Sequence, residues 1–182
     1  AWLAKCYLEE GWIYDAEDVI RNMQRDSIHW QARKEWDYTY ASYYIHTGDY
    51  AKAIPYLRKV IKHEMRSKQR AREWYLMGQL HSALGNKAEA MKAYKMVIRQ
   101  NPPYEVEFNA RIAMTEVMSG SQSKKMIKRL RRMASSDKNK DYLDQVYYAI
   151  GNIYLTQKDT LNAIIAYEKG NSGSTRNGIE KG

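Results

Sequence analysis

The feature that most constrains this chain is a set of residue columns that recur about every 37 positions. One column holds small residues at steps of 37, 37 and 73: Ala4, Ala41, Gly78 and Gly151. A second small column has the same steps: Ala16, Ala53, Ala90 and Ala163. The turn column holds Gly11, Gly48, Gly85 and Lys158, and the aromatic column holds Tyr7, Tyr44, His81 and Tyr154. Four columns with one period indicate an internal repeat.

These columns are what a stack of helical hairpins needs. Small residues let two helices approach closely, turn glycines adopt the positive φ that ends a helix, and aromatic rings fill the spaces between hairpins. Because one hairpin cannot bury its apolar face alone, hairpins stack. The 73-residue step is two periods and predicts a degenerate hairpin made from residues 108–114, a turn at Gly120 and a second helix. The apolar stripe of that second helix is Met126, Ile127, Leu130 and Met133.

One repeat has a familiar order of residues. Residues 74–81 read Trp-Tyr-Leu-Met-Gly-Gln-Leu-His, and Gly85, Ala90, Tyr94 and Pro102 follow. This order resembles the tetratricopeptide repeat (TPR), with a histidine in place of one aromatic residue. The resemblance extends over nearly the whole chain. It implies an all-α fold, a right-handed α-solenoid of stacked antiparallel hairpins, which acts as a protein-binding scaffold.

Two short segments, residues 101–112 and 174–182, have a narrower resemblance. They resemble the TPR lipoproteins of Bacteroidetes linked to gliding motility and type IX secretion, which implies a periplasmic or outer-membrane-associated scaffold in a secretion machine. The chain opens without Met in an amphipathic pattern, so we interpret it as a fragment whose targeting segment or lipid anchor would lie upstream. Any membrane association would then be indirect. Cys6 lies inside the first repeat, so it is not the lipid-bearing cysteine, and we expect it to be a small buried residue.

We predict one TPR-like repeat domain over residues 1–182. Its hairpins are expected near residues 1–28, 29–67, 68–101, 102–138 and 139–170. After Gly170, the stretch Asn-Ser-Gly-Ser predicts a flexible segment. Ser174 is a candidate N-cap for a further helix over residues 174–182, which the end of the sequence would cut short. Neither end shows the polar capping helix that normally closes such a stack, so we expect the array to continue in a longer protein.

The first helix of each hairpin in a TPR stack lines the concave groove. The predicted groove residues are Lys5, Tyr38, Ser42, His46, Tyr75, Gln79, Ser82, Tyr148 and Asn152. Tyrosine occupies the column three residues before the first small one in three hairpins, and it suits an interface because it gives contact area at low entropic cost. The alternative is that these tyrosines only pack between repeats. A clamp for a peptide carboxylate is not predicted, since only Lys5 and Asn152 fit it and they lie in distant repeats.

The net charge of +9 is concentrated in two segments, residues 58–72 and 124–132, each with a net charge of +6. The predicted basic surface comprises Arg66, Arg70, Arg72, Lys124, Lys125, Lys128, Arg129 and Arg132. In the second segment the charges flank the apolar stripe, so that helix is expected on the convex face. Three interpretations remain: a solvated helix face, a surface for an acidic protein or an anionic membrane, and a nucleic-acid surface. The last is disfavoured because no nucleic-acid module accompanies the charge.

No pattern for chemistry appears in the sequence. The four histidines have no cysteine or second histidine at metal-ligand spacing. There is also no phosphate-binding glycine loop and no nucleophile elbow. We therefore predict no enzyme activity, no cofactor, no metal and no small-molecule substrate. The expected partner is a protein or a peptide.

Overall fold

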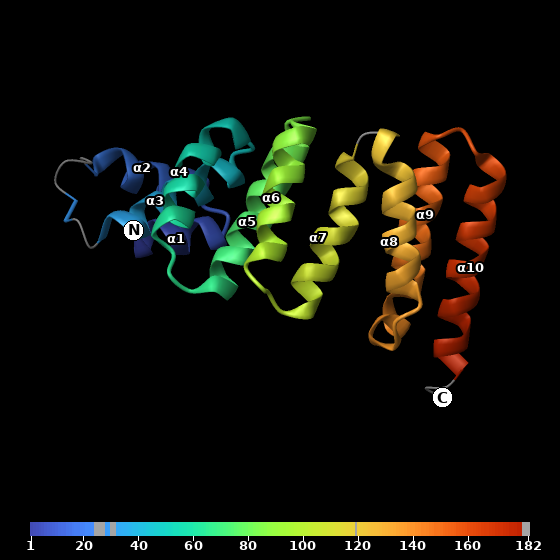
Figure 1. Ribbon diagram of the computed structural model, residues 1–182. Helices are drawn as coiled ribbons and strands as arrows, with labels where there is room; N and C mark the ends of the chain where they lie inside the picture. The colour runs from blue at the N-terminus through green and yellow to red at the C-terminus, as the bar shows by residue number, and fades with distance from the viewer. Residues whose placement is uncertain (24–27, 30–31, 119, 180–182) are drawn as a thin grey trace. The chain divides into compact units, whose positions relative to one another are not determined.

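The computed structural model describes residues 1–23, 28–29, 32–118 and 120–179, and all regular structure in these residues is helical (Figure 1). The α-helices are α1 (Trp2–Glu9), α2 (Ile13–Asn22), α3 (Arg33–His46), α4 (Tyr50–His63), α5 (Ser67–Ala83), α6 (Lys87–Arg99), α7 (Tyr104–Val117), α8 (Ser123–Ala134), α9 (Leu143–Thr156) and α10 (Thr160–Ile179). Two 3-10 helices, η3 (Gly120–Gln122) and η4 (Asp137–Tyr142), precede α8 and α9. The all-α class predicted from the columns is confirmed.

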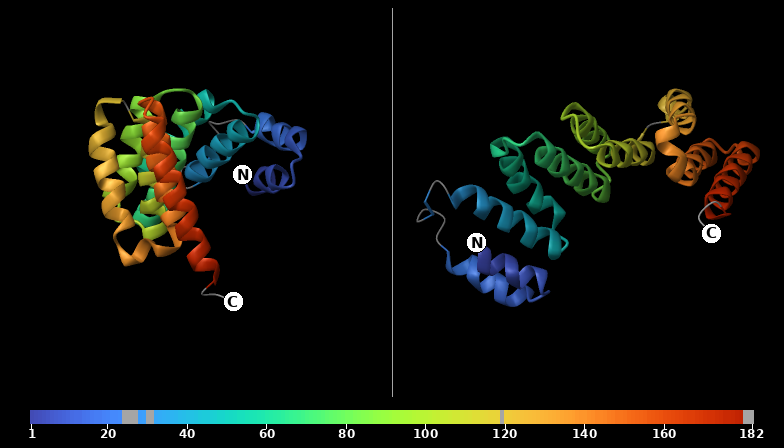
Figure 2. Two further views of the ribbon diagram at one scale, coloured as in Figure 1. Left: turned by 90° about the vertical axis from the view of Figure 1, so that its right-hand side faces the viewer. Right: turned by 90° about the horizontal axis from the view of Figure 1, so that it is seen from below.

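The chain forms two compact units, Ala1–Ala110 (unit 1) and Arg111–Gly182 (unit 2), with the boundary inside α7. In unit 1, α1 packs with α2, α3 with α4, and α5 with α6. In unit 2, α9 packs along α10, as the orange and red helices show in the right-hand view of Figure 2. Each of these pairs is one of the hairpins that the repeat predicts.

The turn column is confirmed at all four positions. Gly11, Gly48 and Gly85 have φ of 78°, 77° and 74°, and Lys158 has φ of 60°. This left-handed conformation ends the first helix of each hairpin. An acidic residue follows the turn in two hairpins, where Asp49 and Asp159 accept the backbone N–H of the residue three positions later, at 3.4 and 3.2 Å. The second helix of each of these hairpins therefore begins with a side-chain cap.

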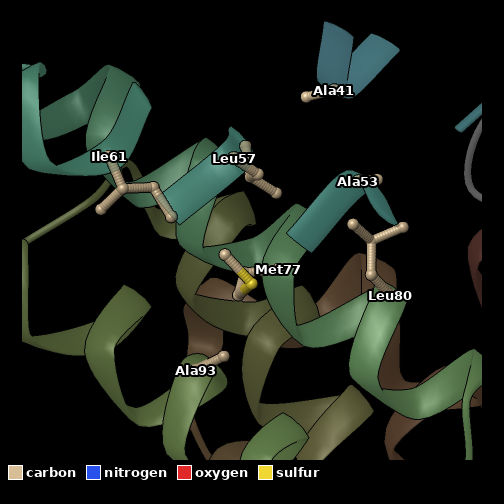
Figure 3. Packing of buried hydrophobic residues seen from close by; sticks show 7 residues of the cluster. All are labelled: Ala41, Ala53, Leu57, Ile61, Met77, Leu80 and Ala93. Atoms are coloured by element: carbon tan, nitrogen blue, oxygen red, sulfur yellow. The ribbon is translucent and has the colours of Figure 1, made fainter. Parts of the chain in front are cut away.

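The two small columns lie at the helix crossings. Ala4, Ala16, Ala53, Ala90 and Ala163 have no exposed surface. In unit 1 one core cluster combines Ala41, Ala53, Leu57, Ile61, Met77, Leu80 and Ala93. Figure 3 shows the side chain of Met77 in the space between Leu57 of α4 and Ala93 of α6. Close approach at the small residues thus lets the larger side chains of neighbouring hairpins fill one core.

Both helices predicted for the degenerate hairpin are present, as α7 and α8, and α8 buries most of the predicted stripe. Phe108 of α7 is 1% exposed, and Met126, Ile127 and Leu130 of α8 are buried, while Met133 is half-buried. Instead of a small residue, Ile127 stands one period after Ala90 in the second small column. Gly120 begins η3, and Ser123, fully buried, donates its hydroxyl to the Gly120 carbonyl at 2.8 Å.

Two expectations are wrong. Cys6 is exposed, because Ala4 and Leu8 take the buried face of α1. The break after Gly170 is also absent, since α10 continues to Ile179. Buried Ala163, Ala166 and Gly170 lie at helical spacing and face α9, and a Cβ on Gly170 would lie 3.4 Å from the Asp144 carbonyl oxygen. This contact with α9 outweighs the low helix propensity of glycine. Residues 180–182 of the further helix expected over 174–182 lie outside the described residues.

Candidate partner-binding surfaces

The tyrosine column lies on the first helices of three hairpins and stays accessible. Tyr38 of α3 is 41% exposed and Tyr148 of α9 is 62% exposed, while Tyr75 of α5 is half-buried. Tyr75 and Tyr148 each pack against a tyrosine of the second helix in their own hairpin, at centroid distances of 5.6 Å to Tyr94 and 5.7 Å to Tyr167. One face of each ring is therefore held in place, and the rest of the exposed area is available for contact.

In unit 1, some polar groove residues already have partners. The Lys5 ammonium lies 2.5 Å from Glu35 and 4.5 Å from the centre of the Tyr38 ring, so it links α1 to α3. His46 Nδ1 lies 2.8 Å from the Ser42 carbonyl oxygen, within the same helix. Lys5 is therefore not a free cation, and it rather fixes the orientation of the Tyr38 ring. The remaining groove residues of this unit, Gln79 and Ser82, are exposed and half-buried.

In unit 2, a cavity of about 430 Å³ lies beside Tyr148. Its lining combines residues of α7, α9 and α10: Ile112, Asp144, Gln145, Tyr148, Tyr167, Gly170 and Asn171. The predicted groove residue Asn152 accepts the Tyr167 hydroxyl at 2.7 Å and thereby holds that ring against Tyr148. The cavity thus offers two aromatic rings, a carboxylate and two amides, which is a lining suited to a peptide side chain.

Most of this lining is absent from the predicted groove residues. The prediction used columns of the first helices, whereas Tyr167, Gly170 and Asn171 belong to the second helix α10. One signal was available in the sequence, because Tyr94 and Tyr167 both stand sixteen residues after a glycine of the first small column.

The comparisons with known proteins agree with this architecture. The tetratricopeptide repeat family matches residues 38–62, 71–104 and 144–172. Three segments of the chain therefore match tetratricopeptide repeats. The three matched segments begin in α3, α5 and α9, the helices that hold the three tyrosines. No curated protein matches the chain in sequence.

Solved structures share the TPR-like fold at low sequence identity. MamA has a TM-score of 0.69 and 17% identity, with 97% of this chain and 96% of that chain covered. A Podospora anserina kinesin-light-chain-like protein with nearly identical TPR-like repeats has a TM-score of 0.71 and 14% identity, covering 96% and 93%. BtubC from P. vanneervenii has a TM-score of 0.60 and 15% identity, covering 96% and 78%. These comparisons give no support to the narrower resemblance to gliding and secretion lipoproteins.

The predicted basic surface is split between unit 1 and unit 2. In unit 1, Arg66 pairs with the buried Glu64, Arg70 is half-buried and Arg72 is exposed. In unit 2, the predicted cations of α8 are all exposed: Lys124, Lys125, Lys128, Arg129 and Arg132. The α8 segment is therefore the more accessible of the two basic segments.

Three further features of the described residues concern catalysis, metal binding and membrane insertion. His81 of α5 is buried, its Nδ1 has no hydrogen-bond partner among the described residues, and burial lowers its pKa. In these residues, no three or more acidic, histidine or cysteine side chains come together as metal ligands would. None of the described helices is both long and apolar enough to span a membrane.

Proposed function

We propose that this chain is a non-enzymatic scaffold that binds a peptide or protein partner along the first helices of its repeats. The observation that carries the proposal is Tyr148, which is 62% exposed at the rim of a cavity with room for a side chain. Tyrosine contributes contact area with little loss of rotamer entropy, which is why it is enriched at interfaces. Its partner ring Tyr167 is held by a hydrogen bond, so part of the surface is preorganised.

The test combines affinity capture with alanine substitutions. Partners retained by the unmodified chain are identified by mass spectrometry and then quantified for Tyr148→Ala and for Tyr38→Ala/Tyr75→Ala. Central aromatic residues of an interface commonly contribute about 2 kcal/mol or more, so each variant is expected to lose most of the captured partner. Tyr14→Ala is the matched control, because Tyr14 is 85% exposed on α2, outside the proposed groove. Retention of the partner by both groove variants would refute the groove.

The competing site is the basic surface of α8, which is favoured by the exposure of its cations. Charge reversal at Lys128, Arg129 and Arg132 would abolish capture if the same partner binds there. If the groove is the site, these changes leave capture of the partner intact and the tyrosine variants lose it. Both site proposals fail if neither set of changes weakens retention.

The cellular setting is a separate part of the proposal. It rests only on the narrower resemblance of residues 101–112 and 174–182 to lipoproteins of gliding motility and type IX secretion. In that setting the captured partners would be components or cargo of a periplasmic or outer-membrane machine. Recovery of only cytoplasmic partners would contradict the setting without affecting the groove.

A further inference from the structure

A second cavity of unit 2 lies beside α8 and is strongly basic. It has a volume of about 680 Å³ and is bordered by α8, the end of α9 and the turn that precedes α10. Four cationic side chains of α8 line it: Lys124, Lys128, Arg131 and Arg132. Arg131 is not part of the basic surface predicted from the sequence. Because Arg131 also lines the cavity, the basic face of α8 borders a concave site.

The amphipathic pattern of α8 explains how the four cations gather. Met126 and Leu130 are buried, so the helix has one fixed inner face. Lys124, Lys128, Arg131 and Arg132 follow each other at helical spacing on one side, and they border the cavity. Lys125 and Arg129 are equally exposed on the same helix but do not line the cavity. The helix therefore presents two basic faces, and only one of them is concave.

The lining of this cavity keeps a net positive charge, because four cations outnumber one carboxylate, that of Asp159. The described part of the chain places no carboxylate within ion-pair distance, 4.0 Å, of any of the four lining cations. Asp159 lines the cavity, but its carboxylate accepts the backbone N–H and the amide of Asn162 at 3.2 and 2.7 Å and so caps α10. Arg131 Nη2 donates to the Tyr154 hydroxyl at 3.1 Å, which positions the guanidinium without compensating its charge.

The dimensions and the neutral lining favour a peptide. The row from Lys124 to Arg132 is about 12 Å long, since a helix rises 1.5 Å per residue, and an extended peptide covers this length with about four residues. Side chains on one face of an extended peptide repeat about every 6.6 Å, close to the spacing of about 6 Å between Lys124 and Lys128. Ser135 and Gln157 also line the cavity and can hydrogen-bond a peptide backbone.

From this geometry we infer that the cavity beside α8 binds an acidic peptide segment with carboxylates at alternate positions. A membrane surface fits poorly, because the cations border one side of a hollow rather than project from a flat face. Nucleic acid fits poorly because Tyr154, the one aromatic residue in the described lining, is half-buried and its hydroxyl is engaged by Arg131, so it offers no free stacking platform. The inference does not depend on the proposed groove, since no lining residue is shared with the cavity at Tyr148.

The test measures fluorescence anisotropy of a labelled eight-residue peptide with Glu at alternate positions, against the same peptide with Gln. The whole chain is compared with Lys128→Gln/Arg132→Gln and with Lys125→Gln/Arg129→Gln, two variants with the same loss of charge on the same helix. All four side chains are exposed, so both variants are expected to fold. The first is expected to weaken binding about tenfold or more and the second about twofold or less, because only the first removes contacts in the cavity.

Three results would overturn the inference. Equal weakening in the two variants would mean that only net charge attracts the peptide. Equal binding of the Gln peptide would mean that carboxylates are not recognised. Retention of duplex DNA or of phosphatidylserine vesicles by the chain, with no binding of the Glu peptide, would assign the cations to another partner. Tyr148→Ala is expected to bind the Glu peptide normally, so failure of the groove and failure of this cavity are distinguishable.

Discussion

In the hairpin α3–α4, Ala41 shares a core cluster with Leu57, which stands sixteen residues later. In the hairpin α9–α10, the same two columns hold Gly151 and Tyr167. A Cβ on Gly151 would lie 2.7 Å from Tyr167 Cδ1, well inside normal contact. The first small column therefore holds alanine opposite an aliphatic side chain and glycine opposite a tyrosine.

The other two hairpins follow the same rule. In α1–α2, Ala4 shares a cluster with Ile20, and in α5–α6 a Cβ on Gly78 would lie 2.6 Å from Tyr94 Cδ1. The total volume at the crossing is thus kept nearly constant, as close packing requires. In the two hairpins with glycine and tyrosine at the crossing, a predicted groove tyrosine also packs on the tyrosine of the second helix. Glycine and tyrosine in place of alanine and an aliphatic residue therefore create an aromatic pair that faces the proposed partner site.

The two hairpins also differ in the polar contact that joins their helices, and this contact gives the largest expected effect. In α3–α4 the Lys34 ammonium lies 2.6 Å from Glu64, which is 4% exposed and also accepts the Arg66 backbone N–H at 2.9 Å. The bond from Lys34 and then that from Arg66 lower the pKa of Glu64 from 4.5 to about 2. Glu64→Gln is expected to cost about 2 to 3 kcal/mol at pH 7, measured by urea unfolding.

The pH dependence of stability identifies the ion pair between Lys34 and Glu64. Because the folded pKa of Glu64 is depressed, its contribution is fully present above pH 4.5 and is lost as the pH falls through about 2. The stability gap between the unmodified chain and Glu64→Gln should close over that range. Burial, and then the charge of Glu64, raises the pKa of nearby Glu73, so Glu73→Gln is the matched control and is expected to cost nothing at pH 7. A gap that stays constant down to pH 2 would contradict the assignment.

The second largest expected change in stability concerns the pairing of glycine with tyrosine at the helix crossing. Gly78→Ala forces a methyl group against Tyr94, which is 2% exposed and has little room to move. Overpacking costs about 1 to 3 kcal/mol, and the better helix propensity of alanine returns up to about 1 kcal/mol, so we expect a net loss of about 1 to 2 kcal/mol.

A double-mutant cycle isolates the crossing. In Gly78→Ala/Tyr94→Leu the pair becomes that of the α3–α4 hairpin, so the double variant should be less destabilised than the sum of the single variants. Gly120→Ala is the control, because a Cβ there would meet no atom within 4 Å. If the effects of Gly78→Ala and Tyr94→Leu simply add in the double variant, glycine and tyrosine occur together without a steric reason.

The repeat columns predict the hairpins and turns because they record contacts at fixed spacing within each hairpin. The turn column even includes Lys158, where glycine is missing and the conformation is kept. By contrast, α10 continues past Gly170, which packs against Asp144, although glycine has a low helix propensity. Local pattern therefore predicts the pairing of helices better than it predicts their length.

The candidate sites are less predictable because they combine residues from several helices. Lys5 is predicted as a groove residue, yet Glu35, thirty residues away, pairs with it. Arg131 lines the basic cavity together with Tyr154 of α9 and with Gln157 and Asp159 of the turn before α10. Burial and partners of this kind follow from tertiary contacts, which a single sequence does not display.

The α9–α10 hairpin has a neutral hydrogen bond between its helices where α3–α4 has an ion pair. Removing this hydrogen bond is expected to cost less stability than removing the ion pair. Tyr167→Phe removes the hydroxyl that donates to Asn152 at 2.7 Å while keeping the ring in place. Because Asn152 is half-buried and can turn toward water, we expect a loss of about 0.5 to 1.5 kcal/mol. Tyr148→Phe is the control, since this hydroxyl belongs to a ring that is 62% exposed, and its effect should stay within about 0.5 kcal/mol. Equal losses in the two variants would argue against the bond.

The smallest expected effect concerns the turns, where the two hairpins differ in one residue. Gly48 and Lys158 share a left-handed conformation, with φ of 77° and 60°, but only glycine adopts it without a steric cost. Lys158 is exposed, so Lys158→Gly should remove that cost and stabilise the chain by about 0.5 to 1 kcal/mol. At Gly48 a Cβ would meet no atom within 4 Å, so Gly48→Ala should lose about the same amount through the backbone alone. Opposite signs and similar magnitudes in urea unfolding would show that both hairpins use one turn conformation, whereas a destabilising Lys158→Gly would mean that the lysine side chain contributes to the α9–α10 turn.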